Sequence, residues 1–133
     1  MTDYAKELFE VLKKDKATLR KVILNIPTQD KEFIFYFKPW TAIDKENCME
    51  QARKVEVIKE EGHEDVKRIY IDENKYIASI IYFMALDENG KRIFDNFKQI
   101  ESLLEYLSWS NLSFLATEMG ADVSTSIKAI YNG

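Results

Sequence analysis

Cysteine, histidine, proline and glycine are all scarce in this sequence of 133 residues. The single cysteine, Cys48, excludes a disulfide within the chain and any zinc site with several cysteines. The single histidine, His63, excludes a zinc site that needs a histidine pair. Two prolines and four glycines leave no linker-like stretch, and no repeat is present. We therefore expect one domain over residues 1–133.

Long apolar runs and a strong excess of one charge are also absent. The longest apolar run spans residues 76–86, about half of the ~20 residues that a membrane-spanning helix needs. The start, "MTDYAKELFEVLKKDK", lacks the apolar core of a signal peptide. The formal net charge of −4 supplies no basic field for nucleic acid or an anionic membrane. These absences predict a cytoplasmic protein that binds neither nucleic acid nor membrane.

Two neighbouring segments have the alternating pattern of β-strands. In "RKVILNIP", Val22 and Leu24 share a face, and in "KEFIFYFKP" one face carries Phe33, Phe35 and Phe37. The polar "TQD" between them predicts an antiparallel hairpin. Aromatic residues of this kind suit base stacking, but the segment lacks the flanking basic residues and glycines of RNA-binding sheets. We therefore expect the Phe face to pack in the core.

The rest of the chain predicts short strands followed by helices. "KVEVIKE" and "VKRIYI" indicate one or two further strands, and residues 73–86, preceded by Asp72 as N-cap, indicate a helix that is apolar nearly all round. The last third reads as two helices with a break at residues 108–111, and the end, about 121–133, is expected to be partly disordered. The expected class is α+β: a small antiparallel sheet, made of the hairpin plus one or two short strands, packed against a central apolar helix, with a helical C-terminal third.

Two more helices are predicted from their N-terminal caps. Thr2 precedes the first helix, whose apolar residues share one face: Tyr4, Leu8, Val11 and Leu12. Thr41 and Asp44 form a T-x-x-D start for the second, a surface helix with a loosely apolar inner side: Ile43, Met49 and Ala52.

No motif for catalysis or cofactor binding stands out. His63 lies in the charged loop "KEEGHEDVK", where an exposed histidine usually has no specific role. Cys48 shares its helix with Glu46 and Glu50, whose carboxylates we expect to raise its pKa, so a packed side chain is favoured over a nucleophile. Phosphate-binding glycine loops and nucleophile elbows are missing. The sequence therefore predicts a non-enzymatic protein without a metal or a cofactor.

The two tryptophans lie at junctions between predicted elements. Trp40 follows the hairpin, and we expect it to pack in the core. Trp109 lies between the two C-terminal helices, where a large side chain can fill the core or anchor a partner. The sequence leaves both readings of Trp109 open.

Two stretches together carry a family resemblance. In the first, "FYFKPWTAID", an extended strand runs into a K-P-W-T turn and a helix start. In the second, an apolar helix ends in "ALDENGKRIFDN". In this order the chain resembles the tail assembly chaperones of long-tailed bacteriophages, over roughly residues 33–119. The matching residues are Lys38, Pro39, Trp40 and Thr41, then Ala85, Leu86, Asp87, Glu88, Gly90, Ile93 and Phe94.

The resemblance implies a non-enzymatic protein of the host cell cytoplasm that is absent from the finished virion. Such chaperones hold the long, aggregation-prone tape measure protein in solution and help tail tube protein subunits to gather around it. Self-association is compatible with this role. The partner would present apolar helical stripes, so its binder should offer an apolar face rimmed by charge. The expected binding residues lie in the C-terminal helices, although packing within the protein is the commoner role of such side chains: Tyr106, Trp109, Leu112 and Phe114.

The main alternative is a small cytosolic adaptor or regulatory domain of another family, which also binds a protein. A tape measure gene directly downstream would favour the chaperone. A catalytic or ligand-binding class would need a pocket that joins His63 to buried carboxylates, and the spacing gives no reason to expect one.

Overall fold

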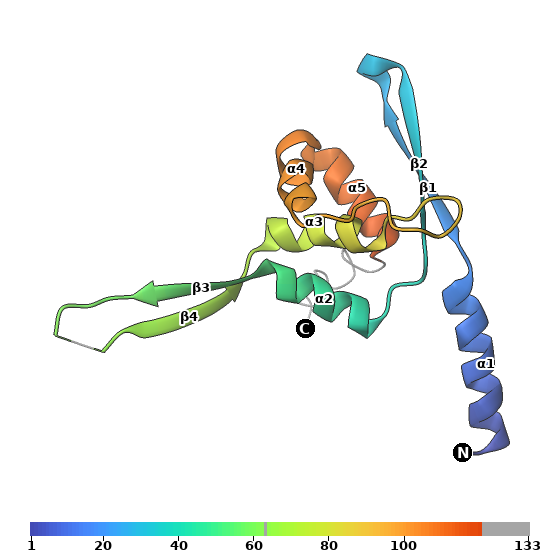
Figure 1. The fold of residues 1–133 in the computed structure, drawn as a ribbon, viewed down its shortest axis with the longest axis horizontal. Coiled ribbons are helices and arrows are strands. Elements are labelled where there is room, and N and C mark those ends of the chain that lie inside the picture. The colour runs from blue at the N-terminus through green and yellow to red at the C-terminus, as the bar shows by residue number, and fades with distance from the viewer. Residues whose placement is uncertain (63, 121–133) are drawn as a thin grey trace, which may run out of the picture.

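A computed structural model shows a helical body from which three arms project (Figure 1). It describes residues 1–62 and 64–120, so the predicted tail at about 121–133 and the loop residue His63 lie outside the described residues. The body consists of α2 (Ala42–Ala52), α3 (Glu73–Met84), α4 (Lys98–Tyr106) and α5 (Trp109–Met119). The arms are α1 (Asp3–Ala17), the ribbon of β1 (Arg20–Ile26) and β2 (Lys31–Phe37), and the ribbon of β3 (Arg53–Ile58) and β4 (Val66–Ile71).

Helix α3 is the central element, as its apolar sequence predicted. It packs against α2 on one side and against α4 and α5 on the other (Figure 1). The predicted cap forms, because the Asp72 carboxylate accepts a hydrogen bond from the Lys75 backbone N–H at 3.1 Å. The buried Ser79 hydroxyl donates to the Lys75 carbonyl at 2.6 Å, which satisfies it inside the core. The helix ends at Met84, just before the predicted end at residue 86.

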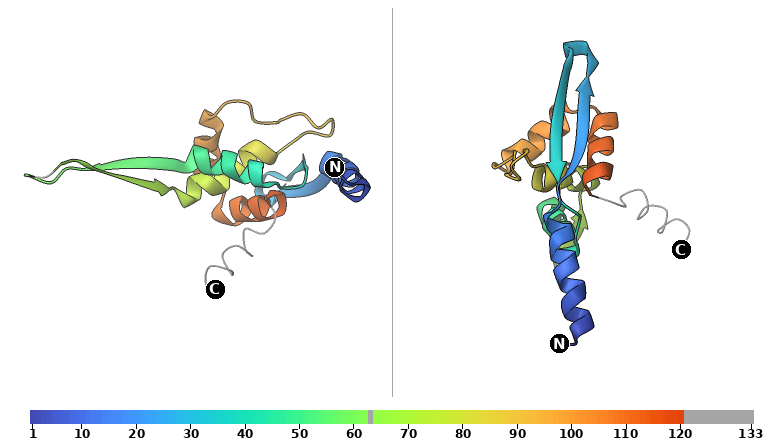
Figure 2. Two further views of the ribbon diagram at one scale, coloured as in Figure 1. Left: turned by 90° about the horizontal axis from the view of Figure 1, so that it is seen from below. Right: turned by 90° about the vertical axis from the view of Figure 1, so that its right-hand side faces the viewer.

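The β1–β2 ribbon is the predicted antiparallel hairpin. A short 3₁₀ turn, Pro27–Gln29, connects the strands, and Val22 lies opposite Phe35. The Phe face packs in the core only near the base of the ribbon: Phe37 is buried and Phe35 half-buried, whereas Phe33 is 49% exposed. The reason is that the ribbon extends past the body, so α5 covers only its inner half (Figure 2).

The two further predicted strands form a ribbon of their own. The α+β class is confirmed, but β3 and β4 pair only with each other and do not extend the first sheet. β3 begins directly after α2 and β4 ends just before α3, so the ribbon leaves the body between these helices (Figure 1). Its base is fastened by Asp72, whose backbone N–H donates to the Ala52 carbonyl at 2.8 Å and whose carboxylate lies 2.8 Å from Lys54 Nζ.

Helix α2 begins with the predicted capping box but buries a different set of side chains. Thr41 and Asp44 exchange hydrogen bonds between side chain and backbone, at 3.3 and 2.9 Å. Cys48 and Ala52, one turn apart, are fully buried against α3. Ile43 precedes Cys48 by five residues, about 140° around the helix, and it is 71% exposed. The prediction that Ile43 lines the inner side is therefore wrong.

The C-terminal third forms the two predicted helices, α4 and α5. Ser108 lies in the predicted break and caps α5, because its hydroxyl accepts from the Asn111 N–H at 3.2 Å. The predicted leucine stripes face the core, where Ile100 and Leu115 are buried. Gly120 follows α5, and a Cβ there would lie 2.6 Å from Ile80 Cγ2. The absence of a side chain lets the end of α5 approach α3 closely.

Candidate partner-binding surfaces

The two stretches that carry the family resemblance lie side by side. Tyr36 of β2 and Leu86 exchange two backbone hydrogen bonds, at 2.9 and 2.7 Å. After Leu86 the chain turns back through "DENG", where the Asp87 carboxylate accepts from the N–H groups of Asn89 and Lys91 at 2.8 and 2.9 Å. Gly90 takes a positive φ of 79° in this turn. These motif residues therefore build a covered edge for β2 rather than a reactive site.

Other motif residues fasten this segment to the body. Trp40 and Phe94 are half-buried and pack against the core, as predicted for Trp40. The segment is also held by Arg92, whose guanidinium lies 4.6 Å from the centre of the Tyr82 ring and donates to the Tyr82 carbonyl at 3.0 Å. The role of these residues is to hold β2 and α3 together.

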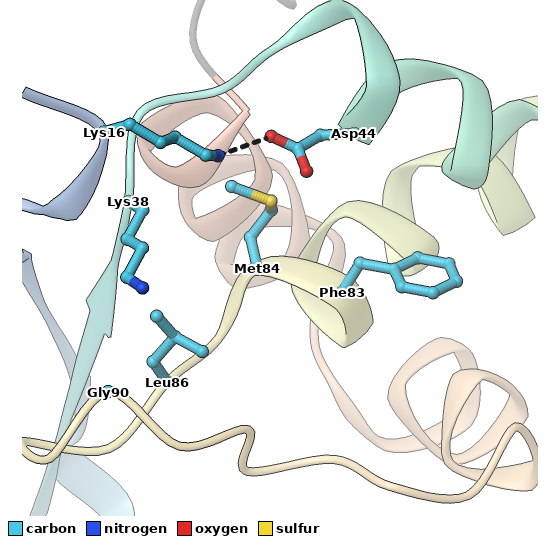
Figure 3. Close-up of a pocket in the computed structure, with 7 residues that line it drawn as sticks. All are labelled: Lys16, Lys38, Asp44, Phe83, Met84, Leu86 and Gly90. Carbon is cyan, nitrogen blue, oxygen red and sulfur yellow. Dashed lines mark hydrogen bonds and ion pairs between the residues drawn. The ribbon is translucent and has the colours of Figure 1, made fainter. Parts of the chain in front are cut away.

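A small hollow lies where α1, the K-P-W-T turn and α3 meet (Figure 3). Lys16 reaches across it, with Nζ 3.0 Å from Asp44 Oδ2 and 2.8 Å from the Pro39 carbonyl oxygen. The hollow has a volume of about 160 Å³, whereas pockets for small molecules span roughly 300–1,000 Å³. Lys16 and Asp44, which line it, already pair with each other. We interpret it as the joint that anchors the base of α1 to the body.

The four residues predicted to bind a partner do not form one surface. Tyr106, at the end of α4, is 81% exposed, and Trp109, at the start of α5, is 60% exposed. Leu112 is 3% exposed and belongs to the core, so it does not lie on the surface where a partner could contact it. Phe114 is 45% exposed but lies about 140° around α5 from Trp109. Only Tyr106 and Trp109 remain as neighbours, at the corner between the two helices.

Helix α1 carries more exposed apolar residues than the corner formed by Tyr106 and Trp109. Its predicted apolar face is present, with Thr2 as its cap, yet no residue of the helix is buried. The whole helix projects from the body (Figure 1). The 3.6-residue pattern identified the face, but the pattern alone could not show that no element of the described chain covers it. The exposed residues of this face are Tyr4, Leu8, Val11 and Leu12, and Phe9, three residues before Leu12, is exposed at its margin.

The Cys48 thiol lies inside the core. Burial, with a smaller contribution from Asp44, raises the pKa of the Cys48 thiol to about 12, so it remains protonated at neutral pH. The direction was predicted, but burial and Asp44 cause it rather than Glu46 and Glu50. Among residues 1–62 and 64–120, no three His, Cys, Asp or Glu side chains gather as metal ligands would.

No helix in the described part of the chain combines the length and the apolar character needed to span a bilayer. Comparisons with protein-family models, curated proteins and solved structures found no match to this chain.

Proposed function

We propose that this protein is a non-enzymatic tail assembly chaperone of a long-tailed bacteriophage. In this role it binds the tape measure protein in the host cell cytoplasm, keeps it soluble and assists the assembly of tail tube subunits around it. The proposal starts from the resemblance of "FYFKPWTAID" and "ALDENGKRIFDN" to that family. The observation that supports it best is the exposed apolar face of α1.

The α1 face has the chemistry that a helical client needs. Leu8 and Leu12, one turn apart, are 48% and 47% exposed, and Val11 beside them is 58% exposed. Apolar stripes of two helices pack by interdigitating their side chains, which removes both from water. Lys13 and Glu10 lie on the opposite side of α1, and this charged side keeps the unbound helix soluble. A long helix with an apolar stripe, such as a tape measure protein presents, fits this surface.

The corner formed by Tyr106 and Trp109 supplies a second contact of the same kind. Exposed tyrosine and tryptophan are the side chains that most often carry binding energy at protein interfaces. Both lie in α4 and α5 of the body, away from α1 (Figure 1). A client that is long and repetitive can touch both surfaces at once, and two weak contacts then add through effective concentration.

Co-expression with the tape measure protein of the same genome tests this proposal. We expect the tape measure protein to be soluble and to co-elute in size-exclusion chromatography only when this protein is present. The double substitution Leu8→Gln with Leu12→Gln should abolish co-elution, because it removes the apolar stripe while keeping helix propensity.

The matched control is Lys6→Gln with Glu10→Gln, which places the same side chains, also one turn apart, on the charged face of α1 and should preserve co-elution. Precipitation of the tape measure protein whether or not this protein is present would sink the chaperone assignment. An adaptor or regulatory domain with another protein partner would then replace it.

A further inference from the structure

The apolar face of α1 follows the seven-residue repeat of helices that pack in pairs. Tyr4 and Val11 are one repeat apart and Leu8 lies between them, so these three residues form the seam of a possible helix pair. Leu12 borders the seam on one side. The four side chains are 47–81% exposed, and no charged residue interrupts the seam. In the described part of the chain, nothing buries this face.

The other side of the seam is bordered by two residues of opposite charge. Glu7 and Lys14 are also one repeat apart, at the position that flanks the seam. Neither forms an ion pair with any residue of 1–62 or 64–120, whereas Asp15 and Lys16 already form ion pairs at the base of the helix. This flank of α1 is therefore acidic in the first half of the helix and basic in the second half.

The order of these charges indicates a second copy of α1 that runs in the opposite direction. In an antiparallel pair with a two-fold axis, the same flank of both helices lies on the same side of the contact. An axis level with residues 10 and 11 is equally far from Glu7 and Lys14, so each Glu7 would lie opposite the other copy's Lys14. Flanking charges of this kind set the partner and the orientation of paired helices. In a parallel pair, Glu7 would instead face the apolar Leu12.

We propose that two copies of this chain pack their α1 helices against each other, antiparallel and about this two-fold axis. Leu8 of each copy packs beside Val11 and Leu12 of the other, which removes these side chains from water. The contact between Glu7 and Lys14 occurs twice, because a two-fold interface uses one surface twice. Since α1 projects from the body (Figures 1 and 2), the two bodies lie at opposite ends of the helix pair.

The length of the seam sets the strength of this dimer. Residues 4–14 cover three turns of helix, about 16 Å at roughly 1.5 Å per residue. A contact of this length is smaller than the roughly 800 Å² per partner of a standard stable interface. We therefore expect a reversible dimer whose population rises with protein concentration.

The dimer would also regulate access to the surface proposed for the client. In the free protein the second copy covers the apolar face of α1, and a client helix with an apolar stripe replaces it. This regulatory role rests on the proposed function. The dimer itself does not, because it is formed and measured without any client.

Sedimentation equilibrium of the purified full chain, without client, tests the dimer. We expect the average mass to rise from that of a monomer toward that of a dimer over a roughly hundredfold range of concentration. Glu7→Lys and Lys14→Glu should each raise the dissociation constant about fivefold or more, because each turns two attractive contacts into two repulsive ones. An equimolar mixture of the two variants should dimerise about as tightly as the unmodified protein, because opposite charges then face each other again.

The matched control is Lys13→Glu, which makes the same change of charge one residue away but on the side of α1 opposite the seam. It should leave the dissociation constant unchanged. The mixture controls for any effect of the substitutions on α1 itself, since both altered helices are still present in it.

Three outcomes would each overturn the α1 dimer: a monomer up to about 1 mM, equal effects of Lys13→Glu and Lys14→Glu, or a mixture that dimerises no better than either variant alone. The chaperone proposal would survive all three, because it is tested by the solubility of the client. Conversely, a client that precipitates would leave the dimer of the free protein intact.

Discussion

The β1–β2 and β3–β4 ribbons are both two-stranded antiparallel hairpins, yet the third residue of each first strand, a valine in both, lies in different surroundings. Val22 in β1 is 5% exposed, whereas Val55 in β3 is 58% exposed. The face of β1 packs against α5, and the backbone of β2 is paired at its outer edge by Leu86. In the described part of the chain, Val55, Val57 and Ile69 of β3 and β4 remain 58%, 47% and 65% exposed. The alternating pattern thus determines which side chains share a face, but it does not determine what covers that face.

The connections of each ribbon explain the difference. β3 and β4 continue almost directly from α2 and into α3, and the Lys54–Asp72 ion pair holds the base between these helices. The ribbon is therefore aimed away from the core. β2 is separated from α2 by residues 38–41, which let the chain turn back so that the base of the first ribbon lies across α3 and α5 (Figure 1). One ribbon contributes to the core, and the other is left as a surface.

The largest expected effect contrasts the base and the tip of the covered ribbon. Phe37→Ala should lower the free energy of unfolding by about 3–5 kcal/mol, because it empties a buried aromatic site. Phe33→Ala, at a position that is 49% exposed, should lower it by about 1 kcal/mol or less. Urea denaturation followed by tryptophan fluorescence measures both. Equal losses would show that the tip is covered as well as the base.

Two valines compare the ribbons directly. Val22→Ala should cost about 2 kcal/mol, from the lost methyl groups and the cavity that remains. Val55→Ala should change the free energy of unfolding by less than about 0.5 kcal/mol when the protein is dilute and monomeric. The same denaturation experiment decides the matter, and a loss at Val55 comparable to that at Val22 would contradict the exposed position of β3.

A substitution directly after α5, the helix that packs on β1, tests how closely the end of α5 approaches α3. Gly120→Ala adds a Cβ that would lie 2.6 Å from Ile80 Cγ2, so α5 or Ile80 must shift. We expect a loss of about 1–3 kcal/mol, as for overpacked cores. Thermal unfolding by circular dichroism provides the measurement. An unchanged melting temperature would mean that the end of α5 moves aside freely.

The smallest effect concerns the base of the exposed ribbon. The Lys54 side chain, together with the Lys75 backbone N–H, holds the pKa of Asp72 below its usual 3.8. Because the pKa is lower in the folded state, this contribution to stability is present above the ordinary carboxyl range and is lost as the pH falls through the folded value.

Asp72→Asn keeps the helix cap but removes the charge. It should therefore lower stability slightly at neutral pH and leave it unchanged near about pH 2–3. Urea denaturation at both pH values checks this expectation. A difference between the two proteins that persists undiminished at low pH would point to the cap rather than to the ion pair.

Features that depend on a few neighbouring residues could be predicted from the sequence. The helix starts at Thr2, Thr41 and Asp72 follow from side chains that accept hydrogen bonds from backbone N–H groups three residues on, and Ser108, predicted only as part of a break, acts in the same way. The apolar character of α3 predicted its central place, since a helix without a polar face must be buried. For the candidate surfaces, the sequence showed that the apolar residues of α1 share a face but did not single it out for binding, and it included Leu112, which is buried in the core.

Only the tertiary structure decided which apolar faces are covered by other elements, because those elements are distant in the chain. The sequence by itself determined the α+β content, the caps, the faces of each strand and helix, and the turn at Gly90 with its positive φ. It did not determine that α5 lies on β1, that Cys48 rather than Ile43 faces α3, or that α1 and the β3–β4 ribbon keep their apolar side chains exposed. Local patterns specify which atoms prefer to leave water, whereas only the folded arrangement decides which of them do.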